Sequence, residues 1–366
     1  MAPHANNFTR WMRRLAIAGV LLCFVVVVLG AYVRLTAAGL GCPDWPGCYG
    51  HLTPLGAAHD AAQGGAPAAA DAPYASRPLI PGKAWREMIH RYAAGTLALV
   101  VVAISAPALR ARRQRLVSIP FALVLLTTVI VQAVLGMLTV TWQLKPLIVT
   151  LHLLFGMTTL ALLWWLLLSL PAAGSWSASA RAGAAADARR GGASPIGSAR
   201  RLTLIALAAL AVQIALGGWT SSNYAAVACP DLPTCQNAWW PHADFRNAFV
   251  LWRGLNIDYE GGVLENPARV AIHLTHRLGA LLASVALALA ALFVLRRRGL
   301  PAARPVAWAV LAALGLQLLI GASMVLRAFP LWLATAHTAG AALLLLAALA
   351  LLRSVSVNTP ARAYRP

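Results

Sequence analysis

Eight long apolar stretches constrain this 366-residue chain more than any other feature. Each is close to the ~20 residues with which an α-helix crosses a hydrocarbon layer of ~30 Å, and in lipid a helix satisfies every backbone hydrogen bond within the segment. Since 60% of the residues are hydrophobic and 11% are charged, a water-soluble enzyme is excluded and an all-α membrane protein is predicted. The predicted spans are residues 15–35, 88–109, 116–140, 147–170, 202–220, 270–295, 306–326 and 331–352.

Basic residues predict the orientation of these spans. Nineteen of the 30 Lys and Arg residues lie in the five segments on one side of an eight-span chain, among them Arg10, Arg13 and Arg14 near the N-terminus. Positive charge marks the cytoplasmic side, so both termini are expected in the cytoplasm of a bacterium, with the spans in its cytoplasmic (inner) membrane. The formal charge of +20 then reflects topology and gives no support for a nucleic-acid partner. Since the first span follows three arginines, a cleaved secretory signal is an alternative for it.

An internal repeat divides the chain. Landmarks of the first half recur in order at a nearly constant offset of 185 to 187 residues, an order that chance does not produce. The sequence predicts two pseudo-symmetric parallel four-helix bundles, 1–170 and 201–353, joined by a cytoplasmic linker, 171–200, and followed by a cytoplasmic tail, 354–366. The recurring pairs are Gly30 and Gly217, Cys42 and Cys229, Cys48 and Cys235, His90 and His276, Gln132 and Gln317, Gly136 and Gly321, and His152 and His337.

Histidines inside the predicted spans form two repeated pairs. His90 with His152, and His276 with His337, lie at similar depths on helices of the same half. Two imidazoles at opposite axial positions hold a heme iron between helices. The alternatives are histidines that bond only to a neighbouring helix and a zinc site, which usually needs four ligands. His273, one turn from His276, leaves the ligand choice in the second half open.

Glu87 is a candidate catalytic acid. Glu87-x-x-His90 places a carboxylate and an imidazole on one helix face, where the carboxylate could serve as a base beside a bound porphyrin. The alternative is an acid at a helix start, facing the positive end of the dipole. A di-iron bundle needs several carboxylates, and no second one is available. In the repeat, the position of Glu87 is taken by His273.

Cysteines and a low-complexity stretch mark the outer loops. Cys42 with Cys48, and Cys229 with Cys235, each close a short proline-containing loop in an oxidising compartment, which favours two disulfides. A pair of redox-active thiols is the alternative. Residues 56–76 are rich in Ala, Gly and Pro, and we expect a mobile insertion there.

Together these motifs resemble the heme A synthase family over about residues 15–352. The resemblance implies oxidation of the C8 methyl group of heme O to the formyl group of heme A for aa3-type cytochrome oxidase. It makes the first half the substrate half, with heme O between His90 and His152 and Glu87 as catalytic residue. It makes the second half a heme b site with His276 and His337 as iron ligands. The motifs that carry it are Gly30-x-x-Val33-Arg34, residues 39–46, Glu87-x-x-His90-Arg91, His152, His276-Arg277 and His337.

The resemblance also implies partners. They are the heme O synthase that supplies the substrate, the assembly of cytochrome oxidase, a membrane electron acceptor and the lipid bilayer. Arg91 and Arg277 are expected to contact heme propionates, with snorkelling to the interface as the alternative. The sequence does not fix the oligomeric state and leaves a homo-oligomer open. The rival function is a diheme b-type cytochrome that carries electrons between quinol and a partner; it needs the four histidines but not Glu87.

Overall fold

The computed structural model describes residues 3–63, 78–110, 116–170 and 195–356. Within these residues, eight helices are long and apolar enough to span a membrane, which confirms the predicted all-helical membrane fold. Their outer faces expose large apolar side chains, as lipid contact requires; Leu99 is 70% and Leu282 72% exposed. The eight helices are α1 (Pro3–Leu35), α3 (Pro81–Arg110), α4 (Ile119–Thr141), α5 (Pro146–Ser169), α7 (Pro195–Ser222), α9 (Asn266–Arg296), α10 (Arg304–Leu326) and α11 (Leu331–Ser356).

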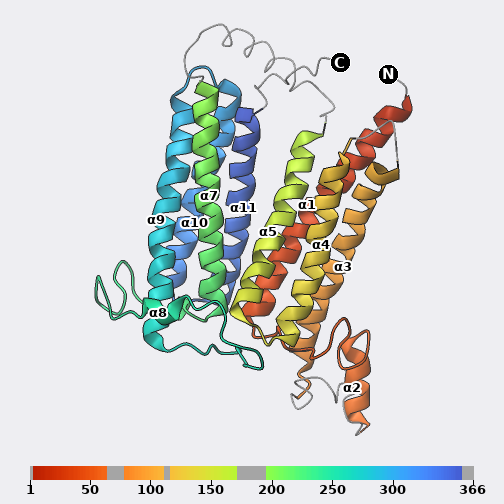
Figure 1. Cartoon of the computed structure of the whole chain (residues 1–366), viewed down its shortest axis with the longest axis vertical. Helices are drawn as coiled ribbons and strands as arrows, with labels where there is room; N and C mark the ends of the chain where they lie inside the picture. The colour runs from red at the N-terminus through yellow and green to blue at the C-terminus, as the bar shows by residue number, and fades with distance from the viewer. Residues whose placement is uncertain (1–2, 64–77, 111–115, 171–194, 357–366) are drawn as a thin grey trace.

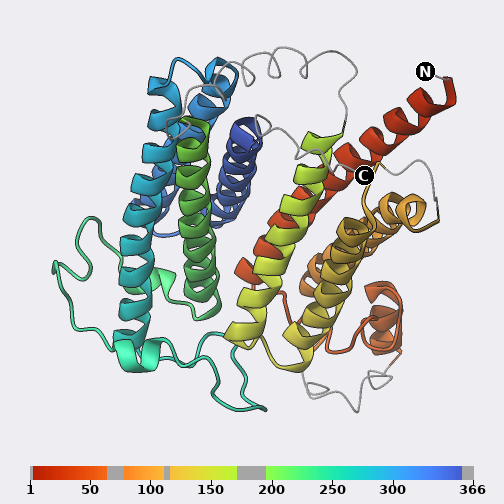
Figure 2. The same cartoon turned by 45° about the horizontal axis from the view of Figure 1, so that its top comes forward.

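The eight helices form two groups that lie side by side (Figures 1 and 2). In the first group α1 packs on α3 and α5, and α4 packs on α3 and α5. In the second group α7 packs on α9 and α11, and α10 packs on α9 and α11. Since α1 contacts α3, α5 and α11, it is an integral part of the bundle.

Four helices form the contact between the groups. α5 packs on α7 and α11, and α1 packs on α11. One apolar core of buried side chains runs through both groups, from Met12 in α1 to Val355 in α11. The indole nitrogen of Trp164 in α5 donates a 2.9 Å hydrogen bond to the carbonyl oxygen of Leu346 in α11. The groups are therefore packed against each other along their length.

Short helices lie in the loops that join these spans. α2 (Pro54–Ala62) follows α1, while η1 (Ala226–Ala228) and α8 (Phe245–Ala248) follow α7, and η2 (Pro301–Ala303) precedes α10. The expected mobile insertion at 56–76 is wrong for residues 56–62, which belong to α2. There Pro54 occupies the first turn, where its missing N–H costs nothing, and alanines with high helix propensity follow. Residues 64–76 of that insertion lie outside the described residues.

Two predicted segments lie mostly outside the described residues. Of the linker 171–200, only 195–200 are described, and they form the first turns of α7, which begins at Pro195. Of the tail 354–366, residues 354–356 end α11.

Candidate functional site

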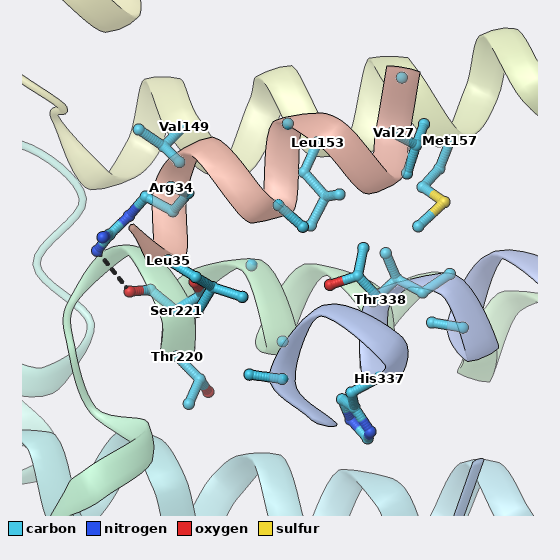
Figure 3. Close-up of a pocket in the computed structure, with 18 of the residues that line it drawn as sticks. Val27, Arg34, Leu35, Val149, Leu153, Met157, Thr220, Ser221, His337 and Thr338 are labelled. Atoms are coloured by element: carbon cyan, nitrogen blue, oxygen red, sulfur yellow. Dashed lines mark hydrogen bonds between the residues drawn. The ribbon is translucent and has the colours of Figure 1, made fainter. Parts of the chain in front are cut away.

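A cavity of about 1700 Å³ runs between the helices and is lined by residues of both groups. The four paired histidines, Glu87 and His273 all line it. Figure 3 shows the part between the groups, where Val27 and Leu153 lie opposite Thr338, while the ring of His337 points away from them. The sequence-predicted polar residues of the spans are thus brought to one internal space.

The structure brings His90 and His152 together. Their ring centroids are 6.4 Å apart and their planes are inclined by 82°. A metal about 2 Å from each ligating nitrogen, with about 1 Å from each nitrogen to its ring centre, separates two centroids by about 6 Å. The pair therefore has the separation that one shared metal ion requires.

His276 and His337 repeat this geometry, with centroids 6.5 Å apart and planes inclined by 78°. His273, which the sequence left as an alternative ligand, faces Phe329 instead, at a centroid distance of 6.4 Å. Its Nε2 accepts a 3.4 Å hydrogen bond from Nε of Arg277. The geometry therefore favours His276 over His273 as the partner of His337.

A glycine of a neighbouring helix lies beside each of the four rings. A Cβ atom added at Gly30 would lie 3.0 Å from Cε1 of His90, and one at Gly321 would lie 3.0 Å from Cε1 of His337. The corresponding distances are 3.5 Å from Gly136 to His152 and 3.3 Å from Gly217 to His276. These glycines recur in the repeat, so their helices leave the rings the same room in each half.

Glutamines support three of the four histidines. The side-chain nitrogen of Gln132 donates to the carbonyl oxygen of His152 at 3.0 Å, and that of Gln317 donates to the carbonyl oxygen of His337 at 3.1 Å. Gln213 donates to the carbonyl oxygen of His276 at 3.0 Å, and the same nitrogen lies 3.0 Å from its Nδ1. Contacts to a ring nitrogen, which Gln213 makes with His276 and Gln317 makes with Nδ1 of His337 at 3.3 Å, orient a ligating imidazole.

Glu87 lies well inside α3, which begins at Pro81. The expected alternative, an acid in the first helical turn, is therefore wrong: the helix starts before the apolar part of the span. The side chain is 4% exposed. Its Oε2 accepts a 2.8 Å hydrogen bond from the backbone N–H of Cys42, and its Oε1 accepts a 2.5 Å bond from Nη2 of Arg91. A buried carboxylate of this kind requires such partners.

The two cysteine loops have the same construction. Disulfides join Cys42 to Cys48 and Cys229 to Cys235, as the sequence predicts. Each loop carries an aspartate that accepts two backbone N–H groups, Asp44 at 2.5 and 2.9 Å and Asp231 at 2.6 and 3.0 Å. The hydrogen bond from the Thr234 hydroxyl, followed by these two, holds the pKa of Asp231 below its ordinary value.

Arg91 and Arg277 fasten these loops to the helices. Nη1 of Arg91 donates to the carbonyl oxygens of Asp44, at 2.8 Å, and of Gly47. Arg277 donates to the carbonyl oxygens of Thr234, Cys229 and Asp231 at 2.7 to 3.0 Å. Since these bonds occupy the Nη donors of both guanidinium groups, contacts to heme propionates stay a prediction.

Sequence reasoning did not single out the roles of Gln213 and Arg34. Position 26, which the offset of 187 pairs with Gln213, is Val26, so the repeat gave no signal for it. Arg34 was noted only as part of a motif, yet its Nη2 donates to the carbonyl oxygen of Ser221 in the other group at 2.8 Å (Figure 3). A polar residue within an apolar span is the one signal that marks both.

Comparison with known proteins gives two matches. The COX15-CtaA family, described as cytochrome oxidase assembly protein, matches residues 13–349 of the chain. The heme A synthase of Shewanella oneidensis is 38% identical over 338 residues, which are 92% of this chain and 93% of that protein. The family match reaches from α1 to α11 and includes both histidine pairs.

Proposed function

Because the chain belongs to the COX15-CtaA family of cytochrome oxidase assembly proteins, we propose that it is a heme A synthase. Its reaction is the oxidation of the C8 methyl group of heme O to the formyl group of heme A, for aa3-type cytochrome oxidase. The observation that carries this proposal is the pair His90 and His152, 6.4 Å apart, with Glu87 one turn from His90. Among the residues that the structure describes, this half alone places a carboxylate beside its histidines.

The residues present fit a porphyrin in either half. Nδ1 of His90 and Nδ1 of His152 are buried without a hydrogen-bond partner. Burial of an unpaired polar atom is costly, and ligation of a metal through either nitrogen engages the imidazole. The glycine beside each ring and the apolar cavity walls leave room for a flat macrocycle. His90 and His152 would hold heme O, and His276 and His337 would hold heme b.

The reaction converts a methyl group to a formyl group by two hydroxylations and the loss of water. When water supplies both hydroxyl oxygens, the carbon loses four electrons and four protons are released, and a membrane electron acceptor takes up the electrons. A heme b bound by His276 and His337 would supply one-electron transfer between the substrate half and that acceptor. His90 and His152 orient the substrate by fixing its iron between α3 and α5.

Glu87 is the residue that accepts protons released at the oxidised carbon. Its carboxylate lies one helical turn from His90, which would hold the porphyrin, and the cysteine loop and Arg91 fix both oxygens. An oriented carboxylate accepts protons released during hydroxylation. In the second half, His273 takes this register and is also buried, at 4% exposure. An imidazole in place of the carboxylate agrees with a half that transfers electrons.

The proposal assigns a half to each task. The first pseudo-symmetric parallel bundle, 1–170, is the substrate half, and the second, 201–353, is the heme b half. Contacts between the groups support a two-fold relation: α1 with α11 corresponds to α7 with α5. Arg34 and Ser221, which the repeat offset of 187 relates, touch each other, as equivalent residues do near such an axis.

The orientation follows from the charge pattern, and the partners follow from the family. The ends rich in arginine face the cytoplasm, so the cysteine loops and the histidine pairs lie toward the outer side of a bacterial cytoplasmic membrane. The linker 171–200 and the tail 354–366 are cytoplasmic. Heme O comes from heme O synthase, and the product goes to cytochrome oxidase assembly.

Extraction of the hemes from the purified protein tests the proposal. Heme O, or its hydroxylated or formylated products, beside heme b supports the enzyme; heme b alone at two per chain supports the diheme cytochrome. Glu87→Gln should keep the porphyrin content and lower heme A output by at least about a hundredfold, the usual contribution of a general acid or base. Glu265→Gln, at an exposed glutamate before α9, is the matched control. Unchanged heme A output in Glu87→Gln removes Glu87 from the mechanism.

A further inference from the structure

We propose that Arg34 binds a propionate carboxylate of the porphyrin held between His90 and His152. The inference rests on the proposed function only in that a porphyrin occupies this first pair. It assigns to α1 the anchoring role that the sequence suggested for Arg91 and Arg277. In those two residues, loop carbonyls occupy the guanidinium groups.

Arg34 is a cation with spare donors in the wall of the cavity. Its Nη2 donates to the carbonyl oxygen of Ser221 at 2.8 Å, while its Nε is buried without a hydrogen-bond partner. Within the described part of the chain, no carboxylate lies within salt-bridge distance of it; Glu260 acts on its charge from farther away and lies 3.8 Å from Nζ of Lys83. A largely desolvated guanidinium with no carboxylate in contact is costly, so an anionic ligand is expected at this point.

Tyr224 supplies a second donor at the same place. The guanidinium carbon of Arg34 lies 4.0 Å from the centre of the Tyr224 ring. The Tyr224 hydroxyl is buried, interacts electrostatically with Arg34 and makes no hydrogen bond of good geometry. Both residues line the cavity. A guanidinium beside a hydroxyl is a donor set that suits a carboxylate, since charge-assisted hydrogen bonds are the strong ones.

The register of α1 places this donor set at the right height. Gly30, whose added Cβ would lie 3.0 Å from the His90 ring, precedes Arg34 by four residues on the same helix face. Four residues rise about 6 Å along a helix, here toward the end that carries the cysteine loops. Propionates hang from one edge of a porphyrin, so a ring ligated by His90 with this edge toward the loops directs a carboxylate at Arg34. The second half has Ser221 in this register and lacks the cation.

A titration that compares two porphyrins tests the anchor. Iron protoporphyrin IX and its dimethyl ester are added to the full-length protein in detergent, and the Soret band reports binding. The part of the signal that His90→Ala abolishes belongs to the first pair. Arg34→Gln should weaken binding of the free acid by about tenfold to a hundredfold, the range for a hydrogen bond to a charged group. Binding of the uncharged ester should stay the same.

Two further variants keep the test independent of folding. Tyr224→Phe, which removes only a hydroxyl, should weaken binding of the acid by about two- to tenfold and again spare the ester. Arg327→Gln, at an exposed arginine after α10, should change neither. The proposal is overturned if Arg34→Gln weakens binding of acid and ester equally, or if it weakens binding of neither. It is also overturned if His90→Ala removes no part of the Soret signal.

Heme A output from the same variants separates this inference from the proposed function. Suppose that the wild-type chain makes heme A but Arg34→Gln binds acid and ester in the wild-type ratio. The proposed function then stands, and the proposed propionate contact of Arg34 is refuted. Suppose instead that the wild-type chain makes no heme A but Arg34→Gln selectively weakens binding of the free-acid porphyrin. The proposed propionate contact then stands, and the proposed function is refuted.

Discussion

Methyl groups added at the glycines beside the histidine rings test the porphyrin sites directly. In Gly30→Ala the new Cβ lies 3.0 Å from Cε1 of His90, and in Gly321→Ala it lies 3.0 Å from Cε1 of His337. Ordinary contacts begin at 3.4 Å, so the ring or the helix must move by a few tenths of an ångström. Gly95→Ala and Gly315→Ala are matched controls, because a Cβ there meets nothing within 4 Å.

The four variants share one effect and differ in another. Alanine in place of glycine inside a helix adds about 1 kcal/mol of stability at all four positions. Overpacking against an imidazole costs about 1–3 kcal/mol and applies only to Gly30→Ala and Gly321→Ala. These two should therefore unfold with a free energy about 1–3 kcal/mol below that of the controls. If the strain falls on the ligated state, porphyrin affinity falls about tenfold for each 1.4 kcal/mol.

The loss of porphyrin occupancy should be specific to one half of the chain. Gly30→Ala should lower occupancy of the first pair and spare the second, and Gly321→Ala should do the reverse. Heme content per chain, measured spectroscopically with and without added porphyrin, and thermal unfolding in detergent are the measurements. Equal heme content and equal stability in Gly30→Ala and Gly95→Ala would refute the assignment of His90 as an iron ligand packed against α1.

Two further predictions concern the loop closed by Cys229 and Cys235. Because hydrogen bonds lower the pKa of Asp231 in the folded loop, its contribution to stability is complete above the ordinary value of about 3.9 and is lost as the pH falls through its folded pKa. Proteolysis of the loop should thus accelerate on acidification, and Asp231→Asn should flatten that dependence; the same pH profile in both would contradict it. Replacing both cysteines by serine should cost about 2 kcal/mol of unfolding free energy, the chain-entropy value for so short a loop, as measured by denaturation against a Cys23→Ala control. A double variant as stable as that control would show that the bridge adds nothing.

Hydropathy was sufficient to predict the eight spans but not where their helices begin. α3 starts at Pro81, whereas the predicted span starts at residue 88. The intervening residues include the charged Lys83, Arg86 and Glu87. A hydropathy scale therefore ends the span before them, whereas backbone hydrogen bonding of the helix continues through them. This difference moves Glu87 from the edge of a span to the interior of a helix. The burial of its carboxylate follows from a loop that only the folded chain brings over it.

The histidine pairs were predictable because the repeat supplies their register. Two copies of the same landmarks at one offset indicate which residues share a depth, and short connections indicate which helices are neighbours. Neither the repeat nor the short connections predict which residues of the two halves contact each other. Arg34 reaches Ser221 only because α1 and α7 meet across the interface, and no local pattern predicts that meeting.

Duplication explains why both halves have the same histidine framework, and the positions where they differ indicate what each half does. In the register of Glu87 the second half has His273, and in the register of Arg34 it has Ser221. A carboxylate and a buried cation are therefore found together in the first half, one beside His90 and the other a turn beyond Gly30. On our two proposals, a porphyrin bound there would have its propionate edge fixed by charge and its methyl carbon near a base. One bound in the second half meets imidazoles and a hydroxyl, which suffice to hold a cofactor but offer no carboxylate to take up its protons.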